Sequence, residues 1–272
     1  MTQDEQHTLT DLTELRGIWL ANDMVVRMRA DGLRLSRQVG PPEGPHFCYS
    51  DGPSLFLGRV GRGPLRIAWD TNLLIDYFDY GKQLWEGGSL PEVVPAEHGE
   101  ELEGLQVLVS LWVIRDIRFQ ILPRVIDDSR RKPLAESVRQ RRVWAWREFC
   151  EALALSEDDG PQRTQRLRRS VDADEDIRAL SSVPAGNDRA LVSDALHAGA
   201  HVFLTCDKAL LKSRDNVAAR GLLVVSPLDL VEELAAAGAL HCLLEPQHLY
   251  WPLPDQRRVS HLIRALMPVG EG

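Results

Sequence analysis

The chain has 272 residues, of which 44% are hydrophobic and 26% charged, and its 40 acidic side chains outnumber 32 basic ones. This composition excludes full-length disorder, and the net charge of −8 argues against a nucleic-acid binder that is basic over its whole surface. A local basic strip remains compatible with these totals. At ~150 residues per domain, the length predicts one large domain or one domain with extensions.

The cysteines and apolar runs predict a cytoplasmic protein. The four cysteines are far apart and form neither a Cys-x-x-Cys pair nor a disulfide framework, which fits a reducing cytosol. Residues 1–7 lack the basic start and apolar core of a signal peptide. The longest apolar run, residues 105–114, is too short to span a bilayer, so we expect no membrane segment.

The first 64 residues give only weak structural signals. Residues 9–28 predict a helix, and a Gly/Pro-rich stretch follows over 40–63. Within it, residues 46–49 and 54–60 are candidate short strands. We interpret residues 1–64 as an N-terminal extension of unknown function.

A regular alternation of elements begins at residue 65. Residues 66–69 predict a strand that runs into Asp70, and the apolar spacing after Asp70 predicts a helix that ends at Gly81. Residues 102–112 carry an amphipathic helical stripe. Residues 117–122 alternate like a strand, and the proline after them can open a short helix.

The rest of the chain alternates more clearly. We predict a long Arg-rich helix over 134–155, a helix over 188–198, strands over 202–205 and 222–225, and a Ser-Pro-capped helix over 227–237. Strands that alternate with helices predict an α/β fold with a parallel sheet covered by helices. The tail that follows holds a candidate last helix.

Acidic residues occupy one edge of this predicted sheet. Asp70 and Asp207 each follow a strand, and Asp188 lies at the start of a helix and projects from its apolar face. Asp127 or Asp128 follows the second strand. Each residue alone is typical of a helix cap or turn, but ligands of parallel sheets bind beyond the carboxyl ends of the strands, so the joint placement favours a site.

Carboxylates at one edge repel one another unless a cation neutralises them. Oxygen ligands suit Mg²⁺ or Mn²⁺, and no Cys/His cluster in the sequence competes for zinc. Such a site can activate water and stabilise the charge that develops on a phosphodiester. The pattern therefore predicts metal-dependent phosphodiester chemistry.

Three segments around these carboxylates resemble PIN-domain nucleases: residues 67–74, 187–211 and 222–230. The resemblance covers about residues 65–236 and implies a PIN-like three-layer α/β/α sandwich around a parallel sheet. It also implies a Mg²⁺- or Mn²⁺-dependent endoribonuclease that acts on RNA. Residues 1–64 and 237–272 would be N-terminal and C-terminal extensions.

The resemblance assigns roles residue by residue. Asp70 is similar to the family's first metal ligand, Asp188 to the third acidic residue and Asp207 to the fourth. Thr205 resembles the hydroxyl residue that supports the site. Two further polar residues would support the first ligand: Thr71 and Asn72.

The second acidic position departs from the family, which usually has Glu there, and two alignments compete for it. If residues 105–111 formed the second strand, Asp116 would match. If residues 117–122 form it, Asp128 fits, with Asp127 beside it. We prefer Asp128, because a proline separates the alternating segment from the next helix. The predicted catalytic and metal-binding set is Asp70, Asp128, Asp188 and Asp207.

Two other groups of charges need an interpretation. Asp194 lies about 240° around the helix from Asp188, so we expect it at the surface or in a position that supports a ligand, and not as a metal ligand itself. The basic residues after the second strand would either contact a phosphate backbone or form a solvated, ion-paired face, and both interpretations stay open. They are Arg124, Arg130, Arg131, Lys132, Arg139, Arg141, Arg142 and Arg147, with a second patch at Arg163, Arg166, Arg168 and Arg169.

Three functional hypotheses follow from these patterns. The first is an endoribonuclease that uses the four aspartates, and the second is a PIN-like module that binds RNA or a protein without cleavage. An aspartyl-phosphate phosphatase is weaker, because Asn72 stands where a second Asp would be expected. A toxin–antitoxin role would imply a small antitoxin partner, and the extensions are candidates for docking a partner, forming a homo-oligomer or covering the sheet.

Overall fold

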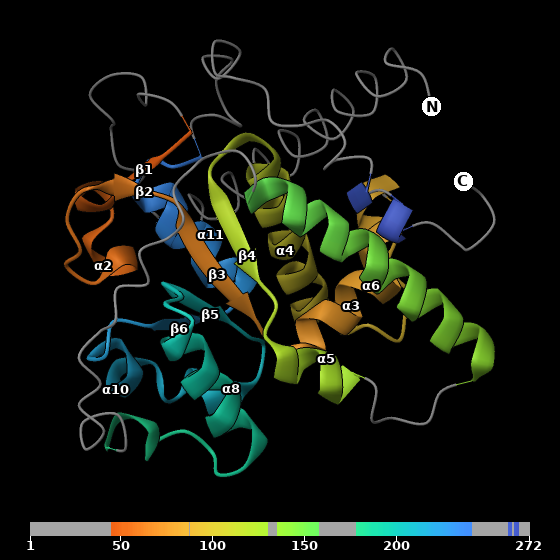
Figure 1. Cartoon of the computed structure of the whole chain (residues 1–272). Helices are drawn as coiled ribbons and strands as arrows, with labels where there is room; N and C mark the ends of the chain where they lie inside the picture. The colour runs from red at the N-terminus through yellow and green to blue at the C-terminus, as the bar shows by residue number, and fades with distance from the viewer. Residues whose placement is uncertain are drawn as a thin grey trace.

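The computed structural model of the chain describes most of the predicted α/β region (Figure 1). The predicted helix at 9–28 lies outside the described residues. The structure describes residues 45–86, 88–129, 135–157, 178–240, 261–262 and 264–266.

Four parallel strands form the central sheet, in the order β4-β3-β5-β6. They are β3 (Leu65–Trp69), β4 (Ile117–Gln120), β5 (Val202–Leu204) and β6 (Leu223–Val225). All residues of β5 and β6 are buried, as is typical of parallel strands covered on both faces. Trp69 pairs with Leu204 and Leu204 pairs with Val225, so three strands end at nearly the same level.

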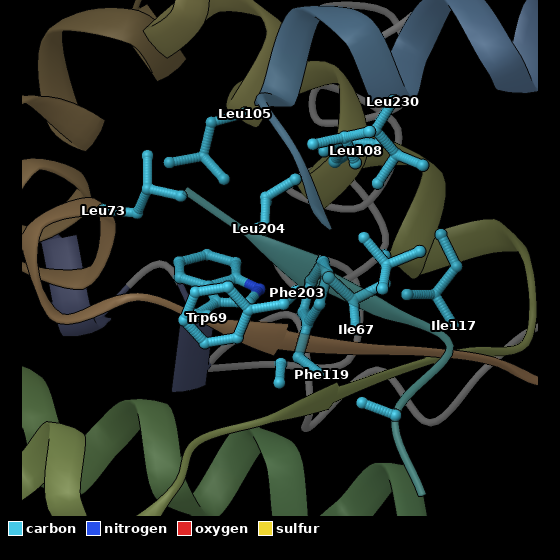
Figure 2. Close-up of a cluster of buried hydrophobic side chains, with 14 of the residues drawn as sticks. Ile67, Trp69, Leu73, Leu105, Leu108, Ile117, Phe119, Phe203, Leu204 and Leu230 are labelled. Atoms are coloured by element: carbon cyan, nitrogen blue, oxygen red, sulfur yellow. The ribbon is translucent and has the colours of Figure 1, made fainter. Parts of the chain in front are cut away.

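Helices connect the strands and flank the sheet. They are α3 (Thr71–Glu86), α4 (Ala96–Ile114), α5 (Pro123–Ser129), α6 (Glu136–Glu157), α8 (Asn187–His197), α9 (Lys208–Leu211), α10 (Arg214–Ala218) and α11 (Pro227–Ala236). Helices α4 and α11 pack together on one side of the strands, while α6 contacts β4 from the other (Figures 1 and 2). This arrangement confirms the predicted α/β fold with a parallel sheet flanked by helices.

Helix α4 contains the longest apolar segment of the sequence. Leu105 and Leu108 are fully buried, and Figure 2 shows Leu108 next to Leu230 of α11. Within the described part of the chain, no helix is long and apolar enough to cross a membrane. Because residues 105–111 are helical, the alternative in which they form the second strand is wrong.

The described residues before β3 form a small subdomain that packs on the same core. Strands β1 (Phe47–Cys48) and β2 (Arg62–Gly63) pair antiparallel, with a 3-10 turn and helix α2 (Pro53–Phe56) between them. The predicted strand at 54–60 is wrong, because Pro53 opens a helix that buries Leu55 and Phe56. Both side chains belong to the main hydrophobic core.

Trp69, the last residue of β3, is the centre of an aromatic cluster. Its ring lies 5.7 Å from Tyr77 of α3, 4.9 Å from Phe119 of β4 and 5.6 Å from Phe149 of α6, measured between centroids. The sheet and two helices therefore share one packing centre directly before Asp70 (Figure 2).

Helix α3 continues past Gly81, contrary to the predicted end there. Gly81 faces the C-terminal helical residues, and a Cβ atom on it would lie 2.7 Å from the Leu266 side chain. Leu262 and Leu266 are buried, and the Glu148 carboxylate lies 3.0 Å from the Arg264 guanidinium. The glycine thus provides space for the C-terminal segment rather than ending the helix.

Candidate functional site

Asp70 lies at the carboxyl end of β3 and is 5% exposed. Its backbone N–H donates to the Leu204 carbonyl at 2.9 Å, which continues the pairing of β3 with β5. One carboxylate oxygen, Oδ1, accepts from the Thr71 N–H at 2.6 Å. The other, Oδ2, accepts from the Thr205 hydroxyl at 2.8 Å. Fixed donors therefore orient both oxygens of this buried carboxylate.

The predicted supporting residues differ in what they contact. Thr205 is fully buried, and its hydroxyl oxygen also accepts from the Asp207 N–H at 3.0 Å, so it joins Asp70 to Asp207. The Thr71 hydroxyl is buried and has no hydrogen-bond partner within the described residues. Asn72 is exposed. The direct contact with Asp70 gives Thr205 the strongest supporting position.

Asp207 is the N-cap of α9. Its Oδ1 accepts from the backbone N–H groups of Ala209 at 2.6 Å and Leu210 at 3.2 Å. Asp207 was expected to form a turn if it had only a structural role, and the structure shows that it caps a helix instead. The cap accounts for Oδ1 alone, because none of the hydrogen bonds found in the described part of the chain uses Oδ2.

Asp188 and Asp128 approach each other from two helices. Asp188 is the second residue of α8, whose N-cap position is occupied by Gly186, so capping does not explain this aspartate. Asn187, the first residue of α8, donates its side-chain amide to Oδ2 of Asp128 on α5. Asp127 is exposed. Among the candidates for the second acidic position, Asp128 is the one whose charge acts on Asp188.

Asp116 lies at the opposite end of the sheet, directly before β4. Its carbonyl accepts from the Leu65 N–H at 2.9 Å. Its carboxylate lies 2.9 Å from His46 and 2.6 Å from Arg118. Asp116 is therefore wrong as the alternative second ligand, because it precedes the strand rather than following it.

The electrostatics of the four aspartates are linked. Burial raises the pKa of Asp70, and the nearby charges of Asp188 and Asp207 raise it further, while hydrogen bonds from Thr205 and the following N–H oppose the shift. Burial also raises the pKa of Asp188, with contributions from Asp207 and Asp128. The structure thus brings all four predicted carboxylates within electrostatic reach of at least one other.

These carboxylates share an edge without converging on a point. Within the described residues, no three His, Cys, Asp or Glu side chains are grouped so that they could enclose a metal ion. Mg²⁺ commonly keeps several of its waters and binds through one or two carboxylates. The donor set therefore fits a largely hydrated Mg²⁺ or Mn²⁺ ion better than an ion enclosed by protein ligands.

A second set of ionisable groups adjoins the first and was missed by the sequence analysis. Burial raises the pKa of the Cys206 thiol to about 12, and the charges of Glu101, Asp76 and Asp70 contribute. Asp76 of α3 lies 3.1 Å from His98 of α4. The sequence carried no signal for this set, because α3, α4 and the segment after β5 that supply its members meet only in the folded chain.

The described arginines after β4 are largely ion-paired within the chain. Arg124 lies 2.9 Å from Asp194, and Arg142 lies 2.8 Å from Asp79. Arg141 donates to the Phe78 carbonyl at 2.6 Å. These contacts favour the interpretation of the basic residues as an ion-paired face. The pair with Arg124 also agrees with the expected position of Asp194 away from the candidate ligands. Seven basic residues of the two patches lie outside the described residues: Arg130, Arg131, Lys132, Arg163, Arg166, Arg168 and Arg169.

Comparisons with protein-family models, curated proteins and solved structures found no match for this chain. The resemblance to PIN-domain nucleases therefore stays a prediction from three sequence segments.

Proposed function

We propose that the chain is a Mg²⁺- or Mn²⁺-dependent endoribonuclease with a PIN-like three-layer α/β/α fold. The observation that carries the proposal is the gathering of Asp70, Asp128, Asp188 and Asp207 from four separate elements at one edge of a parallel sheet. Helix capping explains the position of only one carboxylate oxygen among them, Oδ1 of Asp207. Burial and mutual repulsion oppose ionisation of two of them, and a bound cation would remove that cost.

The strand order and the helices that flank the sheet support the finer fold assignment. Strand β3 lies between β4 and β5, so Asp70 sits centrally at the carboxyl edge. The residues after β4 supply Asp128, and those after β5 supply Asp207. Polar groups at the carboxyl ends of adjacent parallel strands are the usual place for a ligand site in such folds.

The four aspartates would hold the cation together, some of them through water molecules of its hydration shell. When bound, the cation would supply an activated water and neutralise charge on the phosphodiester. Thr205 and the Thr71 N–H hold the Asp70 carboxylate in one orientation. The Asp70 side chain would therefore lose little conformational freedom when a cation binds. Asp207 commits Oδ1 to α9, which fixes the side chain and leaves Oδ2 for the cation.

Cleavage of single-stranded RNA in the presence of Mn²⁺ tests this function. Asp70→Asn is expected to lower the cleavage rate at least 100-fold, because a neutral amide replaces the central carboxylate. Asp116→Asn is the matched control, since it removes the same charge at the opposite end of the sheet and should retain the wild-type rate. Equal rates for Asp70→Asn and wild type, with both proteins folded, would exclude the assignment.

A second candidate is an RNA- or protein-binding module that does not cleave. Two observations favour it: no three candidate ligands in the described residues are grouped to enclose an ion, and Asp128 stands where the family usually has Glu. RNA retained in a gel-shift assay, with no product at any Mg²⁺ or Mn²⁺ concentration, would support this candidate over the nuclease.

A further inference from the structure

The side chain of Asn187 connects two helices that carry candidate ligands. Asn187 is the first residue of α8, and its amide donates to Oδ2 of Asp128 on α5. Asp188 follows directly on α8. The charge of Asp128 contributes to the raised pKa of Asp188, so the two carboxylates lie close enough to repel each other.

The local backbone leaves the Asn187 side chain available for this contact. Asparagine often caps a helix when it precedes the first turn. Here Gly186 takes the N-cap position, with φ of 98°, and no side chain caps α8. The Asn187 amide therefore reaches across to α5 instead of bonding to its own helix.

A separate ion pair already joins the same two helices. Arg124 of α5 lies 2.9 Å from Asp194 of α8. This pair is about one helical turn from Asp128 along α5 and about two turns from Asn187 along α8. Neither of its two members is a candidate ligand. The Arg124–Asp194 ion pair therefore helps to hold α5 against α8. The Asn187 contact differs from it because it directly involves the candidate ligand Asp128.

We propose that Asn187 is a positioning residue that holds the Asp128 carboxylate beside Asp188 so that both can serve one divalent cation. This inference rests on the proposed function. An aspartate reaches less far than the glutamate usual at this position, so its orientation matters more. A hydrogen bond from an amide to an ionised carboxylate is comparatively strong and directional.

Mn²⁺ binding to the full chain, measured by isothermal titration calorimetry without RNA, tests this role. Loss of a residue that orients a metal ligand typically weakens metal affinity about 10- to 100-fold. We expect Asn187→Ala to weaken Mn²⁺ binding at least about tenfold. Asn187→Leu, which keeps the approximate shape but lacks the donor, should show the same loss.

Asp194→Asn is the matched control, because it weakens the ion pair between α5 and α8 and replaces none of the candidate ligands. It should change Mn²⁺ affinity less than about twofold, with a melting temperature similar to that of Asn187→Ala. Unchanged affinity in Asn187→Ala, or equal weakening in both variants, would overturn the inference alone. A wild-type chain that binds no Mn²⁺ at millimolar concentration would overturn the proposed function as well.

Discussion

Thr205→Val is the sharpest perturbation that the site offers. Valine has nearly the same shape as threonine, so the change keeps the packing and removes the buried hydroxyl. Asp70 Oδ2 loses its donor at 2.8 Å, and the Asp207 N–H loses its acceptor at 3.0 Å. One substitution therefore disconnects two of the four candidate ligands.

The size of the effect follows from these two contacts. A hydrogen bond to a charged group contributes about 1.5–3 kcal/mol, and an N–H left without an acceptor in a partly buried place costs about 1 kcal/mol. The additional buried methyl group returns about 0.8 kcal/mol. We expect the free energy of unfolding at neutral pH to fall by about 2–3 kcal/mol.

The loss should depend on pH with a defined sign. The Thr205 donor favours the ionised form of Asp70, whose pKa in the folded chain lies above its ordinary value of 3.8. At acidic pH more of Asp70 is protonated in the folded chain than in the unfolded one. The loss should therefore shrink toward that of a neutral hydrogen bond, about 1 kcal/mol. As the pH rises through the folded pKa of Asp70, the loss should grow to its full value.

Urea unfolding of the metal-free protein, followed by tryptophan fluorescence at about pH 4 and pH 8, measures this difference. Thr205→Ser is the control, because it keeps the hydroxyl and loses one buried methyl group, at a cost of about 1 kcal/mol that is independent of pH. A Thr205→Val loss that is equal at both pH values, or no larger than that of Thr205→Ser, would refute the role of the hydroxyl.

Two further substitutions test the elements that frame the site, both by denaturant unfolding. Asp207→Ala removes the cap of α9 and should cost about 1 kcal/mol, whereas Asp207→Asn keeps an acceptor and should lose less than half of that. Gly104→Ala should cost about 1–3 kcal/mol, because its Cβ would lie 3.0 Å from the backbone nitrogen of Leu228 in α11. Gly99→Ala is the control, because its Cβ would lie 3.4 Å from a side-chain methyl group, and it should be neutral or stabilising. Equal stability of Gly104→Ala and Gly99→Ala would contradict this account of how α4 packs.

The two sets of ionisable groups differ in how the fold stabilises them. Glu101 accepts from the Leu228 N–H at 2.9 Å, so its carboxylate supports the first turn of α11. Asp76 has His98 as a partner. Asp188, by contrast, has only burial and the charges of Asp207 and Asp128 as causes of its raised pKa, with no opposing partner. This contrast is the physical reason why the proposed cation is placed beside Asp188 and its neighbouring aspartates and not beside Cys206.

Local pattern was enough to predict most strands and helices, and it selected all four candidate ligands, with Asp127 and Asp116 left open as alternatives to Asp128. Asp70 and Asp207 follow short apolar strands, and Asp188 lies one turn before the buried residues of its helix. Each of these signals depends on residues within about four positions, where helical or strand periodicity decides which way a side chain points. Parallel pairing then brings strand ends together, so their common edge could also be expected.

The remaining features depend on contacts between distant segments, and only the tertiary structure decided them. Asp128 rather than Asp116 joins the other aspartates because residues 105–111 are packed as a helix against α11, which leaves β4 to pair with β3. Gly81 is no helix end, because Leu266 packs against it from 185 residues further along the chain. Sequence periodicity indicates which side of a helix or strand is buried. It does not indicate which other segment packs against that side, because this depends on the packing of the whole domain.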